Sequence, residues 1–332
     1  MTTSAAALNY EATAAELIRA LRGRRSCADF SRRAGYRSNI ATRWEARQCW
    51  PTASRFLQVQ RRLRPAGPSW VERFFHGPAP DFMSHHDPES PAAVAAFLAW
   101  LKGKAPIVKL AQLAGYNRYT VARWFDGSAE PKLPDFLRLV DVAGRRLLDW
   151  LAAVDDPAQL PSVKQAWAQL QLAREAAYER PFSHAVLRAL ELEDSPRGLR
   201  AQCDFIAQRL GIDPREVEQA LALLKATGQV KRTGRGLRPR KIITVDTNHD
   251  PRRANEVKIA WTSTALERLR RGDPGSFGYS VFAISKPDLA RLDELHLQYV
   301  RAMQAIIASS TPSECVGLYC AQLLNLGSTP LR

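Results

Sequence analysis

The sequence predicts a mainly α-helical protein, with two tandem helix-turn-helix bundles followed by a winged-helix-like region and a small α+β module. Three observations predict this fold class. A helical pattern recurs at one constant offset, a capped helix pair precedes a Gly- and Arg-rich hairpin, and a long amphipathic segment separates two strand-like runs near the C-terminus. We expect bundles at 1–78 and 91–157 with a linker at 79–90, then domains at 158–247 and 248–332.

The internal repeat becomes visible when the chain is shifted so that Ala34 falls on Ala114. The register holds without a gap from about Ala15 to Trp70, which favours duplication of one helical unit over two unrelated segments that share a few core residues. The matching residues of the first copy are Leu21, Ala34, Gly35, Tyr36, Arg43, Trp44, Pro51, Phe56, Leu57 and Trp70. Those of the second copy are Leu101, Ala114, Gly115, Tyr116, Arg123, Trp124, Pro131, Phe136, Leu137 and Trp150.

The second copy contains the clearest helix-turn-helix pattern. Gly115 suits a left-handed turn, Asn117 can cap the following helix, and Val121 and Trp124 are spaced to face inward. We therefore expect a recognition helix near 117–125. Its outward residues would face the major groove of double-stranded DNA, and they are Asn117, Arg118, Tyr119, Thr120 and Arg123.

The first copy predicts a second recognition helix near 38–46. Arg and Asn can make bidentate contacts to guanine and adenine edges, respectively. The residues expected to face DNA here are Arg37, Ser38, Asn39, Thr42 and Arg43.

The first copy departs from the second in two places. Arg37 stands at the position of the capping Asn117, so we expect Ser38 to cap instead. An Ala-Arg pair at 46–47 replaces the Asp-Gly pair at 126–127, so we expect a different exit turn. The copy is either a diverged DNA reader or a degenerate bundle that packs against its sibling, and its positive charge favours the first interpretation.

The net charge of +15 is concentrated in two segments. Residues 1–80 hold 14 basic and 5 acidic residues, and residues 161–245 hold 15 and 9, whereas residues 81–160 hold 9 and 10. Basic clusters on such helical units are typical of nucleic-acid binding, although Arg heavily outnumbers Lys throughout the chain, so composition contributes to the excess. Several cations are expected to contact phosphates, namely Arg24, Arg25, Arg32, Arg33, Arg47, Arg55, Lys102 and Lys104.

The winged-helix-like region contains a capped helix and a basic hairpin. Asp213 is expected to cap a helix with Pro214 at its first position, and residues 228–245 predict the hairpin, or wing. The wing either lies along a phosphate backbone or serves only to join domains, and the sequence leaves both alternatives open. Its basic residues are Lys231, Arg232, Arg235, Arg238, Arg240 and Lys241.

The C-terminal segment predicts a small strand–helix–strand module for dimerisation or sensing. Strands are expected at 277–284 and 315–326, and a helix at 252–271. Ser285 is expected to cap a long helix with a wide apolar face. Such a face commonly packs on a sheet or a partner chain, so we expect a homodimer through the C-terminal half.

The sequence offers no pattern for catalysis, metal binding or membrane insertion. The five cysteines are widely spaced without a C-x-x-C pair, and no catalytic triad or nucleotide-binding loop is present. No apolar run reaches the length of a membrane span. We therefore expect a cytoplasmic, nucleoid-associated protein that is not an enzyme and has no metal or other cofactor.

Two resemblances support a regulatory role. The segments Leu110–Tyr116, Ala122–Gly127 and Pro131–Phe136 resemble phage-repressor (Cro/repressor type) helix-turn-helix domains. The segments Ile206–Lys225, Ser285–Asp288 and Leu318–Leu326 resemble a bacterial family of predicted transcription regulators with a winged-helix-like region and a C-terminal domain of unknown function. These resemblances imply DNA binding and regulation, but they supply no effector.

The sequence thus predicts a sequence-specific double-stranded DNA-binding transcription regulator of the repressor type. Its two unlike recognition helices would read major-groove segments about one helical turn, roughly 34 Å, apart. The alternative is a protein-interaction or antitoxin-like module whose DNA binding is incidental. An unknown effector or protein partner is compatible with both hypotheses.

Overall fold

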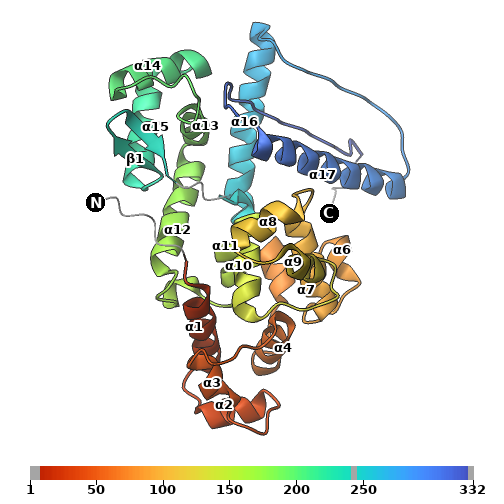
Figure 1. The fold of residues 1–332 in the computed structure, drawn as a ribbon. Helices are drawn as coiled ribbons and strands as arrows, with labels where there is room; N and C mark the ends of the chain where they lie inside the picture. The colour runs from red at the N-terminus through yellow and green to blue at the C-terminus, as the bar shows by residue number, and fades with distance from the viewer. Residues whose placement is uncertain (1–7, 241–244, 328–332) are drawn as a thin grey trace. The chain divides into compact units, whose positions relative to one another are not determined.

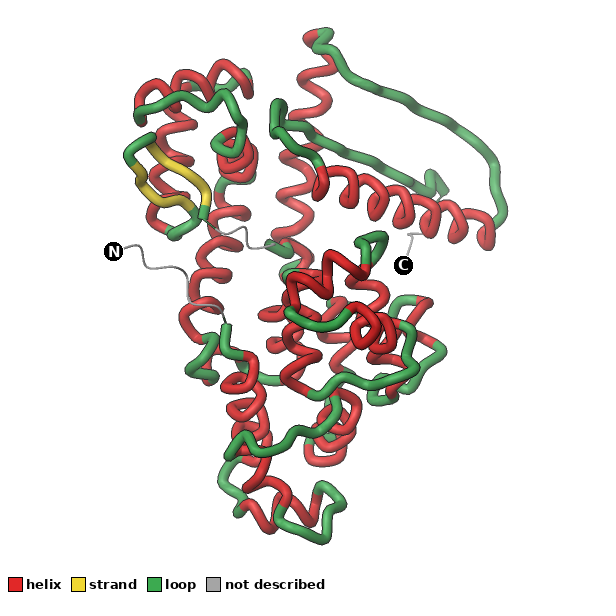
Figure 2. The backbone as a smooth tube through the Cα atoms, in the orientation of Figure 1, coloured by secondary structure: helices red, strands yellow, loops and turns green. Residues whose placement is uncertain are grey.

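The computed structural model describes residues 8–240 and 245–327 and is mainly helical, with one small two-stranded sheet (Figure 1). Lys241, expected in the wing, lies outside the described residues. Helices and connecting loops make up almost all of the described backbone, and the hairpin stands out as the one β-sheet within it (Figure 2). The chain divides into two compact units, residues 1–170 and 171–332, and the division falls within α12 (Lys164–Glu179).

The helices of the first unit follow the internal repeat. The first copy forms α1 (Tyr10–Arg22), α2 (Cys27–Arg33), α3 (Ile40–Glu45), α4 (Ala53–Leu63) and α5 (Trp70–Phe75). The second copy forms α7 (Pro91–Lys102), α8 (Ile107–Ala114), α9 (Arg118–Phe125), α10 (Leu133–Gly144) and α11 (Leu147–Val154). The short helix α6 (Asp81–Ser84) lies between the copies, and the 3-10 turn η1 (Pro157–Gln159) follows them.

One hydrophobic core serves both copies. Its largest fully buried side chains include Trp70 and Trp150, which come from equivalent positions in the two copies. Met83 of α6 is also part of this core, within the segment 79–90 that the sequence analysis treats as a linker. The structure thus differs from the predicted pair of separate bundles, because apolar residues from both copies are buried against one another.

The copies also exchange main-chain hydrogen bonds. The amide of Ala53 donates to the carbonyl of Pro131 at 3.1 Å, and the amide of Leu133 donates to the carbonyl of Pro51 at 2.9 Å. These bonds satisfy backbone groups at the N-terminal ends of α4 and α10, where the helices themselves offer no partner.

Capping of α9 follows the prediction, whereas capping of α3 does not. The Asn117 side chain accepts from the amide of Tyr119, which confirms the expected cap of α9. The prediction that Ser38 caps the first recognition helix is wrong, because α3 begins at Ile40 and has no cap from its own N-cap residue. The hydroxyl of the buried Ser31 in α2 instead accepts from the amide of Ala41 at 3.1 Å.

The exit turns of α3 and α9 share a left-handed residue but close through different hydrogen bonds. The Gln48 amide donates to the Arg43 carbonyl, whereas in the second copy Ala129, one residue later in the repeat, donates to the Arg123 carbonyl. Arg47 has a φ of 60° and the equivalent Gly127 a φ of 80°, so both are left-handed. Glycine adopts this conformation without a steric cost, whereas an L-residue is disfavoured by roughly 1–2 kcal/mol. The first copy therefore keeps the left-handed position of the second with a less suitable residue.

The second unit contains three helices and a hairpin with a separate core, followed by two long helices. These elements are α13 (Phe182–Ala189), α14 (Leu199–Leu210), α15 (Pro214–Ala226), β1 (Val230–Thr233), β2 (Gly236–Pro239), the 3-10 turn η2 (Thr247–His249), α16 (Pro251–Arg271) and α17 (Lys286–Ser309). The predicted hairpin is confirmed, with β1 antiparallel to β2. The caps expected from Asp213 and Ser285 are also confirmed, since their side chains accept from the amides of Arg215 and Asp288.

The two strands expected in the C-terminal segment are absent from the structure, so the prediction of an α+β module is wrong. Residues 277–284 and 315–326 run between and after the long helices without forming a ladder. Alternating apolar residues make a strand only when a neighbouring strand satisfies the backbone, and these segments have none among the described residues. Tyr279 and Val281 consequently remain 96% and 78% exposed.

Replacing Arg47 by glycine tests the cost of the left-handed turn. We expect Arg47→Gly to raise the free energy of unfolding by about 0.5–1 kcal/mol, because relief of the strain outweighs the extra chain entropy of glycine in the unfolded state. Gly127→Ala should lower it by about 1–2 kcal/mol, since its Cβ would also come within 3.2 Å of the Ala95 Cβ. Thermal and denaturant unfolding of the full chain would measure both changes, and a destabilised Arg47→Gly variant would contradict this account.

Candidate nucleic-acid interface

The five residues expected to read DNA in the second copy lie on the exposed side of α9 or at its start. The helix buries Val121, Trp124 and Phe125 against the core. This burial fixes the rotation of α9 about its own axis, because the buried residues follow the helical repeat. Asn117, Arg118, Tyr119, Thr120 and Arg123 are all exposed.

The turn that leads into α9 is held by α10. The hydroxyl of Tyr116 donates to the carboxylate of Asp135, and its ring packs edge-on against Trp124. Burial raises the pKa of the Tyr116 phenol above its ordinary value, and the bond to Asp135 raises it further, so the hydroxyl stays protonated and keeps donating. Arg138 of α10 donates to the Ala114 carbonyl at 2.9 Å, which satisfies the C-terminal end of α8.

Arg118 and Tyr119 form one composite surface at the N-terminal end of α9. The Arg118 guanidinium lies 4.6 Å from the centroid of the Tyr119 ring and donates to its hydroxyl at 2.5 Å. Tyr119 is nevertheless 64% exposed. The pair therefore presents hydrogen-bond donors and a flat aromatic face together, and both are suited to polar base edges and sugar–phosphate groups.

The residues expected to read DNA in the first copy are likewise exposed. Arg37, Ser38, Asn39, Thr42 and Arg43 all face outward, whereas Ala41 and Trp44 are buried. The outward face of α3 is therefore open, although the first copy does pack against the second through their shared core. The structure leaves both interpretations of the first copy, a diverged DNA reader or a degenerate bundle, as hypotheses. The Asn39 side-chain oxygen accepts weakly from Ser31 at 3.4 Å, which orients this amide beside the start of α3.

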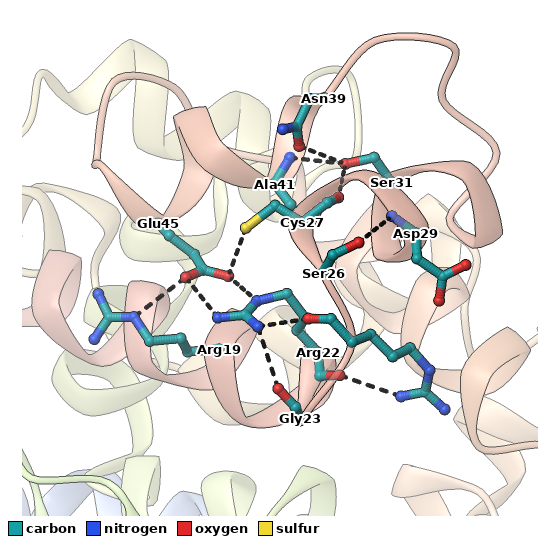
Figure 3. Close-up of polar contacts among 11 residues, drawn as sticks. Arg19, Arg22, Gly23, Ser26, Cys27, Asp29, Ser31, Asn39, Ala41 and Glu45 are labelled. Carbon is teal, nitrogen blue, oxygen red and sulfur yellow. Dashed lines mark hydrogen bonds and ion pairs between the residues drawn. The ribbon is translucent and has the colours of Figure 1, made fainter.

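An ion-pair cluster around Glu45 holds α3 against α1 (Figure 3). The second copy has an apolar contact at the equivalent position. The carboxylate of Glu45 accepts from Arg22 at 2.6 Å and lies 3.4 Å from Arg19, both on α1. The side chains of Glu45 and Arg22 are only 14% and 20% exposed. The position equivalent to Glu45 is the buried Phe125.

Glu45 is not among the residues predicted for this site, although the repeat contains a signal for it. A carboxylate at a position that is apolar in the sibling copy needs a compensating cation, because an unpaired buried charge is costly. Arg22, whose equivalent is Lys102, supplies that cation. The hydrogen bond to Glu45 raises the pKa of Arg22 above its ordinary value.

The expected phosphate-binding residues of the first unit are mostly exposed. Arg24, Arg25 and Lys104 are exposed, and Lys102 is half-buried with its ammonium group donating to the carbonyl of Gly103 at 3.0 Å. Arg32, Arg33 and Arg47, also expected to contact phosphates, are exposed around α2 and α3, and the first two pair with Asp29. Arg55 does not fit the expectation, because its guanidinium donates to the Ala34 carbonyl and the Tyr36 hydroxyl.

The hairpin presents four of its five described basic residues to solvent. Lys231, Arg232, Arg235 and Arg240 are exposed. Arg238 does not fit the prediction of a phosphate contact, because its guanidinium donates to the carbonyls of Leu190 and Ser195 at 3.0 and 3.3 Å. It ties the hairpin to the end of α13, a contact that the basic composition of the hairpin could not reveal.

The helix that precedes the hairpin is a poor match for a polyanion. Its buried face is apolar, with Val217 and Leu221 in the core of this unit. Its exposed face carries Glu216 and Glu218 next to Arg215. Carboxylates repel phosphates, so the electrostatic case for DNA contact in this unit rests on the hairpin rather than on α15.

The described residues do not form a metal site or a membrane-spanning helix. Within 8–240 and 245–327, no group of three or more His, Cys, Asp or Glu side chains is arranged to hold a metal ion. No single helix of these ranges is long and apolar enough to cross a membrane; α7 and α8 reach that length and composition only as a pair bent by 102°. Phe97 and Leu98 of that pair are buried in the protein core.

Comparison with known proteins gives one match. Residues 162–324, slightly less than half of the chain, match the model of a family described as a domain of unknown function (DUF4423). No curated protein and no solved structure matches the chain. The matched region comprises most of the second unit, and the family description names no activity.

Removing the charge of Glu45 tests the ion-pair cluster. We expect Glu45→Gln to lower the free energy of unfolding by about 1–3 kcal/mol, because Arg22 would keep its largely buried charge without a carboxylate partner. The matched control is Glu267→Gln, which removes an exposed carboxylate from α16 and should change stability by less than about 0.5 kcal/mol. Equal unfolding curves for the two variants would show that apolar contacts alone hold α3.

Proposed function

We propose that this protein is a sequence-specific double-stranded DNA-binding transcription regulator of the repressor type. Under this proposal α2–α3 and α8–α9 are helix-turn-helix units, and α3 and α9 enter the major groove. The observation that carries the proposal is the same in both copies: the apolar side of the helix is fixed in the core while its Arg, Asn, Thr or Tyr side chains stay exposed. A nucleoid-associated protein would follow from this activity.

The chemistry of the exposed residues supports base reading as well as phosphate binding. Arg43 and Arg123 can each donate two hydrogen bonds to a guanine, and Asn39 can pair with an adenine edge. The exposed cations around α2 and α3 would supply the electrostatic part of the affinity. In the second unit, the hairpin would add backbone contacts through Lys231, Arg232, Arg235 and Arg240, without Arg238.

We further propose that two chains associate through α17. Leu295, Tyr299, Ile306 and Ile307 of this helix are more than half exposed. An exposed apolar surface of this extent marks an interaction site. A second copy of the same helix offers a matching apolar surface, as two-fold dimers require.

One observation favours the alternative, a protein-interaction or antitoxin-like module. Val108 and Leu113 of α8 are 48% and 63% exposed, close in sequence to the exposed Tyr119. Exposed apolar side chains on α8 would suit a protein partner better than a phosphate backbone. Capture of one dominant protein partner, together with weak salt-labile binding to duplexes of any sequence, would support this function instead.

Truncating the composite surface of α9 tests the proposed function. The wild-type chain should bind a selected duplex at nanomolar concentration with a steep dependence on salt. We expect the double variant Arg118→Ala, Tyr119→Ala to lose about 1–3 kcal/mol of discrimination, roughly 5- to 150-fold in the affinity ratio between selected and scrambled duplexes.

The control for that experiment is Arg180→Ala, which removes an exposed arginine from the second unit. It should leave the affinity ratio unchanged. If the double variant keeps the wild-type ratio, α9 is not a base-reading helix and the assignment fails.

A charge placed on α17 tests the proposed dimer. We expect Ile306→Lys to shift the chain from dimer to monomer in sedimentation equilibrium, because a buried ammonium group without a partner opposes association. Gln304→Lys adds the same charge at an exposed polar position and should leave the dimer intact. A wild-type chain that sediments as a monomer at micromolar concentration would exclude this interface.

A further inference from the structure

The two copies meet at a symmetric main-chain contact. Thr52 and Lys132, which occupy equivalent positions of the repeat, form an isolated antiparallel bridge. Ala53 donates to Pro131 and Leu133 donates to Pro51, at 3.1 and 2.9 Å. Each hydrogen bond is the image of the other when the two copies are exchanged.

Such a contact defines the relation between the copies. When a residue pairs with its own equivalent in an antiparallel bridge, the two segments are exchanged by a two-fold rotation. A head-to-tail arrangement would instead pair a residue of one copy with a different residue of the other. The bridge therefore places a local two-fold axis between Thr52 and Lys132.

Other contacts of the first unit follow the same axis. The equivalent rings of Trp70 and Trp150 lie 6.4 Å apart between centroids, and α5 packs against α11. The first helix of each copy packs against the fourth helix of the other, α1 against α10 and α7 against α4. Packing within the copies differs, because α10 also packs against α7 and α8 of its own copy, whereas α4 has no comparable packing against α1 or α2 in the described residues. The two-fold relation therefore describes the contacts between the copies.

The halves are not identical in the way they hold their recognition helices. The carbonyl of Ala34 accepts from Arg55, whereas the equivalent carbonyl of Ala114 accepts from Arg138, which lies one helical turn later in the repeat. The reading surfaces differ as well: Arg43 and Arg123 are equivalent, but Asn39 corresponds to Tyr119.

We infer that a single chain binds an inverted pair of unlike half-sites, one read by α3 and the other by α9. This inference rests on the proposed DNA binding. A two-fold rotation reverses the direction of one recognition helix relative to the other, so adjacent major grooves are read on opposite strands. Arg43 and Arg123 select the same base, guanine, at mirrored positions. The residues around these two arginines differ, so they select different base pairs next to the guanine in each half-site.

Selection of bound duplexes from a random pool tests the inference, and it uses the full-length chain with Ile306→Lys, the variant expected to be monomeric, so that one chain binds each duplex. The expected motif has two half-sites whose centres are about 10 base pairs apart, in inverted orientation. Each half-site contains a guanine at the mirrored position, and the other bases of the two half-sites differ. Arg43→Ala should erase the preference for guanine in one half-site only, Arg123→Ala in the other only, and the control Arg180→Ala in neither.

Each outcome of this selection is decisive. A direct repeat, a single half-site or a perfect palindrome would overturn the inference while leaving sequence-specific binding intact. Loss of the preference in both half-sites from one substitution would overturn it too, because that result means that two chains contribute the same helix. A pool without any enriched sequence would overturn the proposed function itself.

Discussion

The pairing of Pro51–Ala53 with Pro131–Leu133 is the constraint on which the first unit depends. It joins the starts of α4 and α10, and the shared core around Trp70 and Trp150 extends from this point. Backbone groups at helix ends must find partners when they are shielded from water. Because each copy supplies the partner of the other, neither copy completes this contact alone, and both α3 and α9 belong to one compact unit.

Within that body, the copies stabilise equivalent helices by different physics. Phe125 anchors α9 by apolar burial, whereas Glu45 anchors α3 through charges on α1. An ion pair is directional and needs each partner in place, while an apolar contact tolerates small shifts. Because Glu45 and Phe125 hold α3 and α9 from the inner side, the outward residues of both helices can differ in sequence without disturbing the shared core.

The second unit divides into a packed part and an unpacked part. Helices α13 to α15 and the hairpin enclose a core, and Gln202 bonds both main-chain groups of Leu237 inside it. By contrast, α17 and the extended segment before it leave large apolar side chains in solvent. A chain that buries so little of this surface by itself is suited to association, and the hairpin is fixed independently of that association.

Sequence by itself determined the features that depend on neighbours along the chain. These include the repeat, the caps by Asn117 and Ser285, the hairpin and the outward direction of Arg118 and Arg123, since a cap spans three residues and a helix face repeats every 3.6. Only the tertiary structure decided that Ser31 caps α3, that Arg238 turns inward and that the strand-like C-terminal runs remain unpaired. These outcomes depend on contacts between distant segments or on their absence, and local propensity does not encode them.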